Sequence, residues 1–170
     1  TLSKELGGQM ITMVPTTVGK VVADGTPSEE WKWLVEGIKE VYAHAEKAGI
    51  RIAIEPLNRF ETYFLNRADQ AMALAKAVGP NCGVCIDLFH MNIEEKNQAV
   101  AIRKAGKLLG HFHACGSGRG TPGTDHIDWK PIAAALKANA IVSKSRSSPT
   151  STMSASCRVT ARKAAANDLV

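Results

Sequence analysis

The sequence lacks any long hydrophobic run. No stretch of its 170 residues approaches the roughly 18 consecutive apolar residues that a membrane span requires, so we expect no membrane partner. Its first ten residues, TLSKELGGQM, lack an initiator Met and the charged-then-apolar pattern of a signal peptide. We therefore expect a fragment or a processed chain. With 45% hydrophobic and 22% charged residues, the composition is that of a soluble globular protein with a sizeable core.

Cysteine is scarce as well. Cys82, Cys85, Cys115 and Cys157 do not form a disulfide framework of the kind found in small secreted domains, which favours a reducing cytoplasm. The spacing in CGVC (82–85) is compatible with a redox pair or a metal site. This pair lies in an apolar, strand-like run, however, where residues three apart point to opposite faces. We therefore favour simple strand packing for it.

Two catalytic signatures and a basic surface are also absent. The glycine-rich stretch GSGRGTPG (116–123) lacks the Gly-Lys-Ser/Thr ending of a phosphate-binding loop, and no Gly-x-Ser-x-Gly nucleophile elbow occurs. Residues 144–170 hold five basic residues and one acidic residue, a balance of +4 out of the net +5. The other residues carry only +1, so the basic composition does not indicate a nucleic-acid partner.

Strand-like and helical segments alternate along the chain. Short apolar runs predict four strands, at 9–15, 50–56, 82–90 and 108–116. Helical spacing and capping residues predict four helices, at 26–49, 66–80, about 93–107 and 128–140. We expect Thr26, Asn66 and Asp128 to be N-caps, with Glu29 completing a capping box and Gly49 ending the first helix.

The order βαβαβαβα, with about 30 residues per unit, predicts an α/β fold with a parallel sheet. Four units do not close an eight-stranded barrel, so they form either half of a barrel or an open doubly wound sheet. From Ser143 onward the composition shifts to Ser, Thr, Arg and Ala without strand alternation, which is typical of a linker or a disordered tail. We therefore divide the chain into residues 1–140 and an atypical tail at 141–170.

Side chains that can bind a metal stand at the ends of three predicted strands. Glu55 ends the second strand, Asp87 follows in the third, and His113 lies near the end of the fourth. Because the carboxyl ends of parallel strands meet at one edge of a sheet, we expect these residues to converge. Two carboxylates and an imidazole are suitable ligands for a divalent metal. Burying their charges without a partner would be costly.

Three further polar residues, Glu61, His90 and Arg119, follow these positions by six, three and six residues. We expect all three in loops on the same rim, where they could bind the hydroxyl groups of a polar substrate. His90 could also carry protons.

Each residue also has an ordinary explanation. A glutamate at a strand end can be solvated, an aspartate can cap a loop, and one of two alternating histidines, His111 and His113, can be a structural hydrogen-bonding group. Arg119 can lie in a flexible loop, and we interpret His126 as an ordinary loop residue. Three ligand-type residues at three consecutive strand ends nevertheless favour a metal site.

Three motifs carry a family resemblance. AIEPLNRFETYFLNR, GVCIDLFHMNIEE and GHFHACGSGRGTPGTDHIDW, in this order, resemble the ketose 3-epimerase family. That family comprises D-tagatose and D-psicose 3-epimerases within the xylose isomerase-like TIM barrels. The resemblance runs from about residue 5 to residue 138. It implies a partial (β/α)₈ TIM barrel, in which the predicted strands match the family's fourth to seventh.

The resemblance also implies roles for the rim residues. It implies an isomerase of carbohydrate metabolism that inverts C3 of a small ketose through an enediolate, with Mn²⁺, Co²⁺ or Mg²⁺ as cofactor. Glu55 would be both a metal ligand and the acid/base at C3, and Asp87 and His113 would be metal ligands. The matching substrate-binding positions are Glu61, His90 and Arg119.

One part of the family's site is absent. Inversion of a carbon centre requires two bases on opposite faces, yet no glutamate follows Glu95. The resemblance stops near Asn139, so the family's second catalytic glutamate would fall in the tail. We interpret the tail as the product of a reading-frame shift or a damaged gene, which translation of the other two frames would test.

This departure leaves alternatives open. The chain could be an inactive ketose 3-epimerase, another sugar isomerase of the same superfamily, or a non-catalytic metal-binding barrel fragment. An endonuclease-like member is disfavoured, since residues 1–143 are nearly neutral. Open sheet edges would invite association, so we also expect a homo-oligomer.

Overall fold

The computed structural model describes residues 2–139, so the tail at 141–170 lies outside the described residues. Within that range four strands form a single sheet in the order β1-β2-β3-β4, and every neighbouring pair is parallel. The predicted α/β fold with a parallel sheet is therefore confirmed. The strands are β1 (Met10–Met13), β2 (Arg51–Ile54), β3 (Cys82–Asp87) and β4 (Leu109–His113).

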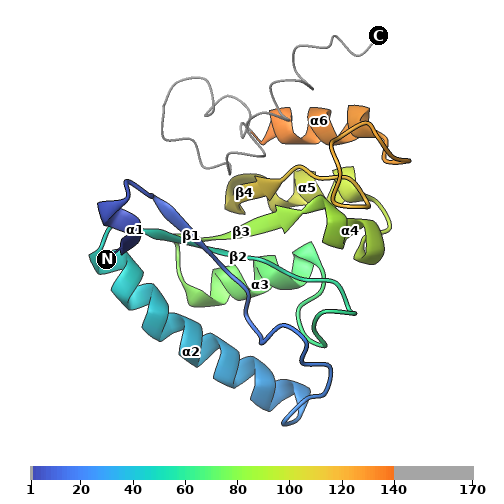
Figure 1. Ribbon diagram of the computed structural model, residues 1–170. Coiled ribbons are helices and arrows are strands. Elements are labelled where there is room, and N and C mark those ends of the chain that lie inside the picture. The colour runs from blue at the N-terminus through green and yellow to red at the C-terminus, as the bar shows by residue number, and fades with distance from the viewer. Residues whose placement is uncertain (1, 140–170) are drawn as a thin grey trace.

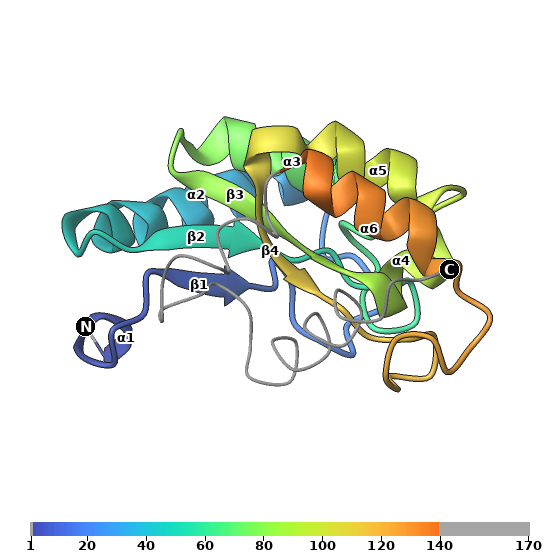
Figure 2. The same ribbon diagram turned by 90° about the horizontal axis from the view of Figure 1, so that it is seen from above.

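Helices α2, α3, α5 and α6 lie along one face of the sheet (Figures 1 and 2). Helices α2 and α3 pack against β2, α3 also packs against β3, and α5 packs between α3 and α6. No helix among residues 2–139 is long and apolar enough to cross a membrane. The helices are α1 (Leu2–Glu5), α2 (Pro27–Lys47), α3 (Ala68–Val78), α4 (Leu88–Glu94), α5 (Gln98–Ala105), the short 3₁₀ helix η1 (Gly106–Leu108) and α6 (Trp129–Ala138).

The first long helix, α2, has the ends that its sequence predicts. Thr26 Oγ1 accepts a hydrogen bond from the Glu29 amide at 3.3 Å, and Glu29 Oε2 accepts one from the Thr26 amide at 2.9 Å. This reciprocal pair is the predicted capping box. Gly49 follows the helix with a φ of +70°, a left-handed conformation that turns the chain towards β2.

The start of α3 differs from the prediction. The predicted cap, Asn66, instead donates from its side-chain amide to the backbone carbonyls of Leu57 and Thr62, at 2.8 and 2.9 Å. The N-cap is Arg67. The prediction for Asn66 is wrong because its amide holds the loop that precedes the helix.

Strand β3 also ends earlier than predicted, at Asp87 rather than at residue 90. Asp87 Oδ1 accepts a hydrogen bond from the Phe89 amide at 2.8 Å, and this cap starts α4 at once. The single helix predicted at 93–107 is in fact α4 and α5, and the second begins at a cap formed by Asn97. The predicted cap of α6, Asp128, is confirmed.

The two faces of the sheet differ in chemistry. On β3, Cys82, Val84 and Ile86 belong to the hydrophobic core beneath the helices. Cys85 and Asp87 alternate with them and point to the opposite face, as the period of a strand requires. The helix-facing side thus supplies the core, and the other side presents polar groups.

Candidate metal and catalytic site

The three predicted ligand positions lie together at the carboxyl edge of the sheet. Glu55 directly follows β2, and its amide still donates to the carbonyl of Met13 at 2.9 Å, which fixes it to the ladder. Asp87 ends β3 and is the register partner of His113, the last residue of β4. Parallel topology alone therefore brings residues 58 positions apart in the chain to one rim.

These side chains converge on one nitrogen. His113 Nδ1 lies 3.1 Å from Glu55 Oε1 and 3.2 Å from Asp87 Oδ2. Both carboxylates are buried, at 7% and 3% exposed. Two ligands that bind one cation at about 2.1 Å and at a right angle are separated by about 3 Å. The two distances from His113 Nδ1 match this spacing, and the chemistry of the three side chains suits Mg²⁺ or Mn²⁺.

Hydrogen bonds and charges within this group of side chains shift the pKa values of Asp87 and His113 in opposite directions. Burial raises the pKa of Asp87, but hydrogen bonds from His113 and Cys115 and the charge of Arg119 outweigh it and lower the pKa to about 2. Hydrogen bonds to Asp87, Cys85 and Glu55 raise the pKa of His113. A metal that binds His113 would therefore displace a proton from its ring.

His90 lies in α4, not in a loop as predicted. Its Nδ1 accepts a hydrogen bond from the Asn58 amide at 3.1 Å and lies 2.8 Å from the Asn58 side-chain nitrogen. Its Nε2 lies 3.4 Å from Nη2 of Arg119, a group that can only donate, so donors face both ring nitrogens and the contacts do not assign the tautomer. Burial lowers the pKa of His90 and outweighs the opposing effect of Asp87 and Glu61, which keeps the ring neutral.

His90 also lies close to the two carboxylates. One ring nitrogen of His90 and one carboxylate oxygen each of Glu55 and Asp87 lie within 4.8 Å of one another. By proximity, His90 is therefore a candidate metal ligand beside His113.

Glu61 and Arg119 lie in loops above the carboxylates, as predicted. Glu61 Oε1 accepts from the Asn58 side chain at 3.0 Å and lies 3.8 Å from the Arg119 guanidinium. Arg119 Nη1 donates to Asp87 Oδ2 at 2.8 Å, and its guanidinium stacks 3.9 Å over the ring of Phe89. Arg119 reaches this position from a left-handed backbone conformation, with a φ of +63°.

Two residues of the site were not predicted. Asn58 is 2% exposed and links the Glu55 loop to His90 and Glu61. The one signal in the sequence that could have indicated Asn58 is its position midway between two predicted site residues, Glu55 and Glu61. Cys115 Sγ donates to Asp87 Oδ1 at 3.2 Å. A thiol two residues after a predicted ligand has no distinctive pattern, so only the structure shows its role.

His126 lies outside this set. Its Nε2 is 3.2 Å from Asn92 Oδ1, and its Nδ1 is 3.5 Å from Ser117 Oγ. The same loop is organised by Asp125, which accepts hydrogen bonds from the backbone and hydroxyl of Ser117 and from the Ile127 amide. An ordinary loop role for His126 is consistent with these contacts.

Comparison with known proteins bears on the family of this chain. The model of the family described as "Xylose isomerase-like TIM barrel" matches residues 1–143. The chain belongs to the xylose isomerase-like TIM barrel family. This membership confirms the predicted partial barrel, and similarity to ketose 3-epimerases confirms the resemblance seen in the three motifs.

Relatives within the xylose isomerase-like TIM barrels are named epimerases. The chain is 48% identical over 104 residues to D-psicose 3-epimerase of Agrobacterium fabrum, an alignment covering 61% of this chain and 36% of the relative. It is 38% identical over 132 residues to D-psicose 3-epimerase of Ruminiclostridium cellulolyticum, covering 77% and 44%. A solved L-ribulose 3-epimerase matches with a TM-score of 0.75 and 33% identity, over 81% of this chain and 47% of that one. The chain thus spans less than half the length of these relatives.

Proposed function

We propose that this chain carries the metal-binding half of a ketose 3-epimerase site, in which Glu55 is the base at C3. The observation that carries the proposal is the convergence of Glu55, Asp87 and His113 at the carboxyl ends of three adjacent strands. The names of the relatives support a ketose as substrate. Mn²⁺, Co²⁺ or Mg²⁺ is the proposed cofactor, because two of the three ligands are carboxylates.

The chain's own residues would divide the chemistry. The Glu55 carboxylate takes the C3 proton, and the electron pair of the broken C–H bond forms the C2–C3 double bond of an enediolate. A bound divalent cation would stabilise the negative charge that develops on the ketose oxygens. Asp87 and His113 would hold that cation. Glu61, His90 and Arg119 would position the hydroxyl groups.

Complete inversion also needs a proton delivered from the opposite face. No glutamate follows Glu95 in the sequence, so this chain supplies one of the two carboxylate bases that we expect. We therefore propose that the chain removes the C3 proton but epimerises slowly or not at all. This proposal separates the capacity for deprotonation from the capacity for inversion.

The direct test is incubation with Mn²⁺ and D-fructose, D-psicose or D-tagatose, followed by chromatography for the C3 epimer. Any epimer that forms should disappear with Glu55→Gln and persist with Glu36→Gln, which changes an exposed glutamate on α2. Epimer formation by wild-type protein would mean that a second base is supplied by the tail or a neighbouring subunit. Epimer formation that survives Glu55→Gln would contradict the role of Glu55.

One contact favours a second candidate function, a non-catalytic metal-binding or folded fragment. Arg119 occupies Asp87 Oδ2 at 2.8 Å, the same oxygen that faces His113. An ion pair of this kind can be purely structural. Asp87→Ala separates the two candidates: loss of activity supports the catalytic site, whereas loss of metal binding or stability without any activity to lose supports the non-catalytic alternative.

We also propose a homo-oligomer in a reducing, cytoplasmic environment. Among the described strands, β1 and β4 each have one neighbour, and such edges favour pairing with another chain. Cys82, Cys85 and Cys115 are free thiols, which supports the reducing environment. Light scattering at micromolar concentration tests the assembly, and a monomeric mass would refute it.

A further inference from the structure

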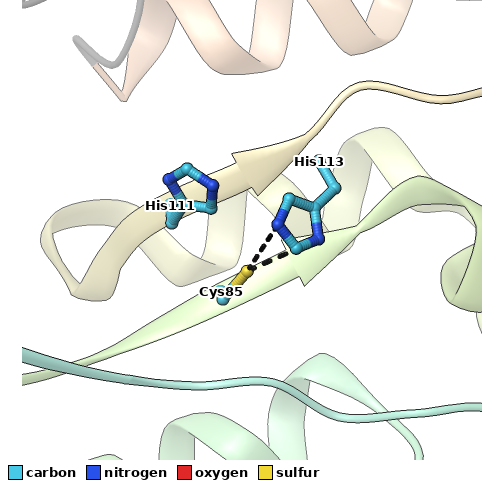
Figure 3. A group of neighbouring side chains, drawn as sticks. All are labelled: Cys85, His111 and His113. Carbon is cyan, nitrogen blue, oxygen red and sulfur yellow. Dashed lines mark hydrogen bonds between the residues drawn. The ribbon is translucent and has the colours of Figure 1, made fainter. Parts of the chain in front are cut away.

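A second group of side chains that can bind a metal lies two residues before Asp87 and His113 on the same two strands. We call Glu55, Asp87 and His113 the carboxylate set. Cys85 on β3 is the register partner of His111 on β4, just as Asp87 is the partner of His113 two residues later. Partners in adjacent parallel strands present their side chains to the same face. Figure 3 shows Cys85, His111 and His113 gathered on that face. The proposed function uses His113 but neither Cys85 nor His111.

The distances within this group are short. Cys85 Sγ lies 3.9 Å from each ring nitrogen of His113. The rings of His111 and His113 meet edge to face, with centroids 4.9 Å apart. One ligand atom from each of the three residues lies within 4.8 Å of the others. Cys85 is fully buried, whereas both imidazoles are partly exposed and accessible to an ion from solvent.

We propose that Cys85, His111 and His113 form a second cation site, selective for a zinc-type metal, which shares His113 with the carboxylate set. One thiolate and two imidazoles suit Zn²⁺ in a tetrahedral site with a fourth position open. Standard zinc–sulfur and zinc–nitrogen bond lengths at a tetrahedral angle place sulfur and nitrogen about 3.6 Å apart. The observed 3.9 Å is slightly longer, and because Sγ is equally far from both ring nitrogens, the His113 ring must also rotate to direct one lone pair at the cation.

Metal binding at this site needs no oxidant or reductant. The S–H bond of Cys85 breaks, its proton passes to solvent, and the sulfur lone pair binds the cation. Each histidine contributes the lone pair of one ring nitrogen as a neutral ligand. No atom changes oxidation state.

The shared ligand makes the two sites exclusive. This part of the inference rests on the proposed function, because it assumes that the carboxylate set also holds a cation through His113. Oxygen-rich sites favour Mg²⁺, while the thiolate and imidazoles favour zinc-type metals. A neutral imidazole has only one free lone pair and serves one cation at a time. Zinc in the thiolate site would therefore displace Mg²⁺ from the carboxylate site.

The test uses Co²⁺, a spectroscopic substitute for Zn²⁺, added to the reduced full chain. A cobalt–thiolate bond gives a charge-transfer band in the near ultraviolet, and we expect that band in wild-type protein. Cys85→Ser and Cys85→Ala should abolish it, and His111→Ala should weaken it. Zn²⁺ should remove it by competition. Absence of the band in wild-type protein, or its persistence in both Cys85 variants, would overturn the proposal.

Matched variants locate the thiolate. Cys82→Ser changes a thiol on the same strand that is equally buried but faces the core, and Cys115→Ser changes the thiol beside Asp87. Both should keep the band, and its loss in either while Cys85→Ser retains it would contradict the assignment. Circular dichroism shows whether each variant is folded.

Two further experiments, one variant and one metal competition, separate this inference from the proposed function. Glu55→Gln should keep the band, because the thiolate site does not use that carboxylate. Saturating Mg²⁺ should weaken the wild-type band through competition for His113. A band that is unchanged by Mg²⁺ would contradict the sharing of His113. Failure of the C3 chemistry with an intact band would refute the epimerase function and leave the thiolate site standing.

Discussion

The Asp87 carboxylate contacts four groups at the carboxyl edge of the sheet. Its Oδ1 accepts hydrogen bonds from the Phe89 amide, which starts α4, and from the Cys115 thiol. Its Oδ2 faces His113 and Arg119 at 3.2 and 2.8 Å. Asp87 therefore links the start of α4 to the loop that carries Arg119. In the proposed function, where Asp87 also binds a metal, this residue ties the stability of the fold to the chemistry of the site.

This arrangement predicts an acid-dependent loss of stability in metal-free protein. Asp87 has a pKa of about 2 in the folded state against an ordinary value of 3.8, so its ionised form stabilises the fold above about pH 4. That contribution, about 2 kcal/mol, is lost as the pH falls towards 2. Urea unfolding across this range should show the difference between wild-type and Asp87→Asn shrinking as the solution becomes more acidic.

The control for this measurement is Asp69→Asn, which changes an exposed aspartate in the first turn of α3. Its difference from wild-type protein should vary much less over the same pH range. A difference between wild-type and Asp87→Asn that stays constant from neutral pH to acid would contradict the assigned role of Asp87.

At the scale of elements, local signals predicted some boundaries and missed others. The ends of α2 followed from Thr26, Glu29 and Gly49, because capping boxes and left-handed glycines act within a few residues. The cap at Asn66 was wrong because its amide bonds to carbonyls in the preceding loop. The early end of β3 was missed because Asp87 resembles a strand residue until its bond to Phe89 is seen.

The capping box makes a prediction at this scale. Thr26→Ala removes the hydroxyl that accepts from the Glu29 amide and should lower the free energy of unfolding by about 1 kcal/mol. Ser28→Ala, in the same exposed first turn, should change it by less than about 0.5 kcal/mol. Chemical denaturation of both variants measures the contrast, and equal effects would show that the cap contributes nothing specific.

At the scale of the whole molecule, topology explains why the convergence of the three residues was predictable. Parallel strands joined by helices place their carboxyl ends on one rim, so Glu55, Asp87 and His113 could be brought together from spacing alone. The contacts that refine the set could not be obtained in this way. The bonds from Asn58 to His90 and from Cys115 to Asp87 depend on loop and rotamer geometry that no spacing encodes. The tail at 141–170 and the domain boundary before it stay predictions.

The most direct test of the central claim follows the C3 proton of D-fructose by NMR in D₂O with saturating Mg²⁺. In the proposed function Glu55 alone removes this proton and returns a deuteron to the same face, so we predict exchange at C3 even without epimer. Glu55→Gln should slow that exchange by at least about 100-fold, whereas Glu36→Gln should not. Full retention of the C3 proton by metal-loaded wild-type protein, or exchange that is indifferent to Glu55→Gln, would contradict the account.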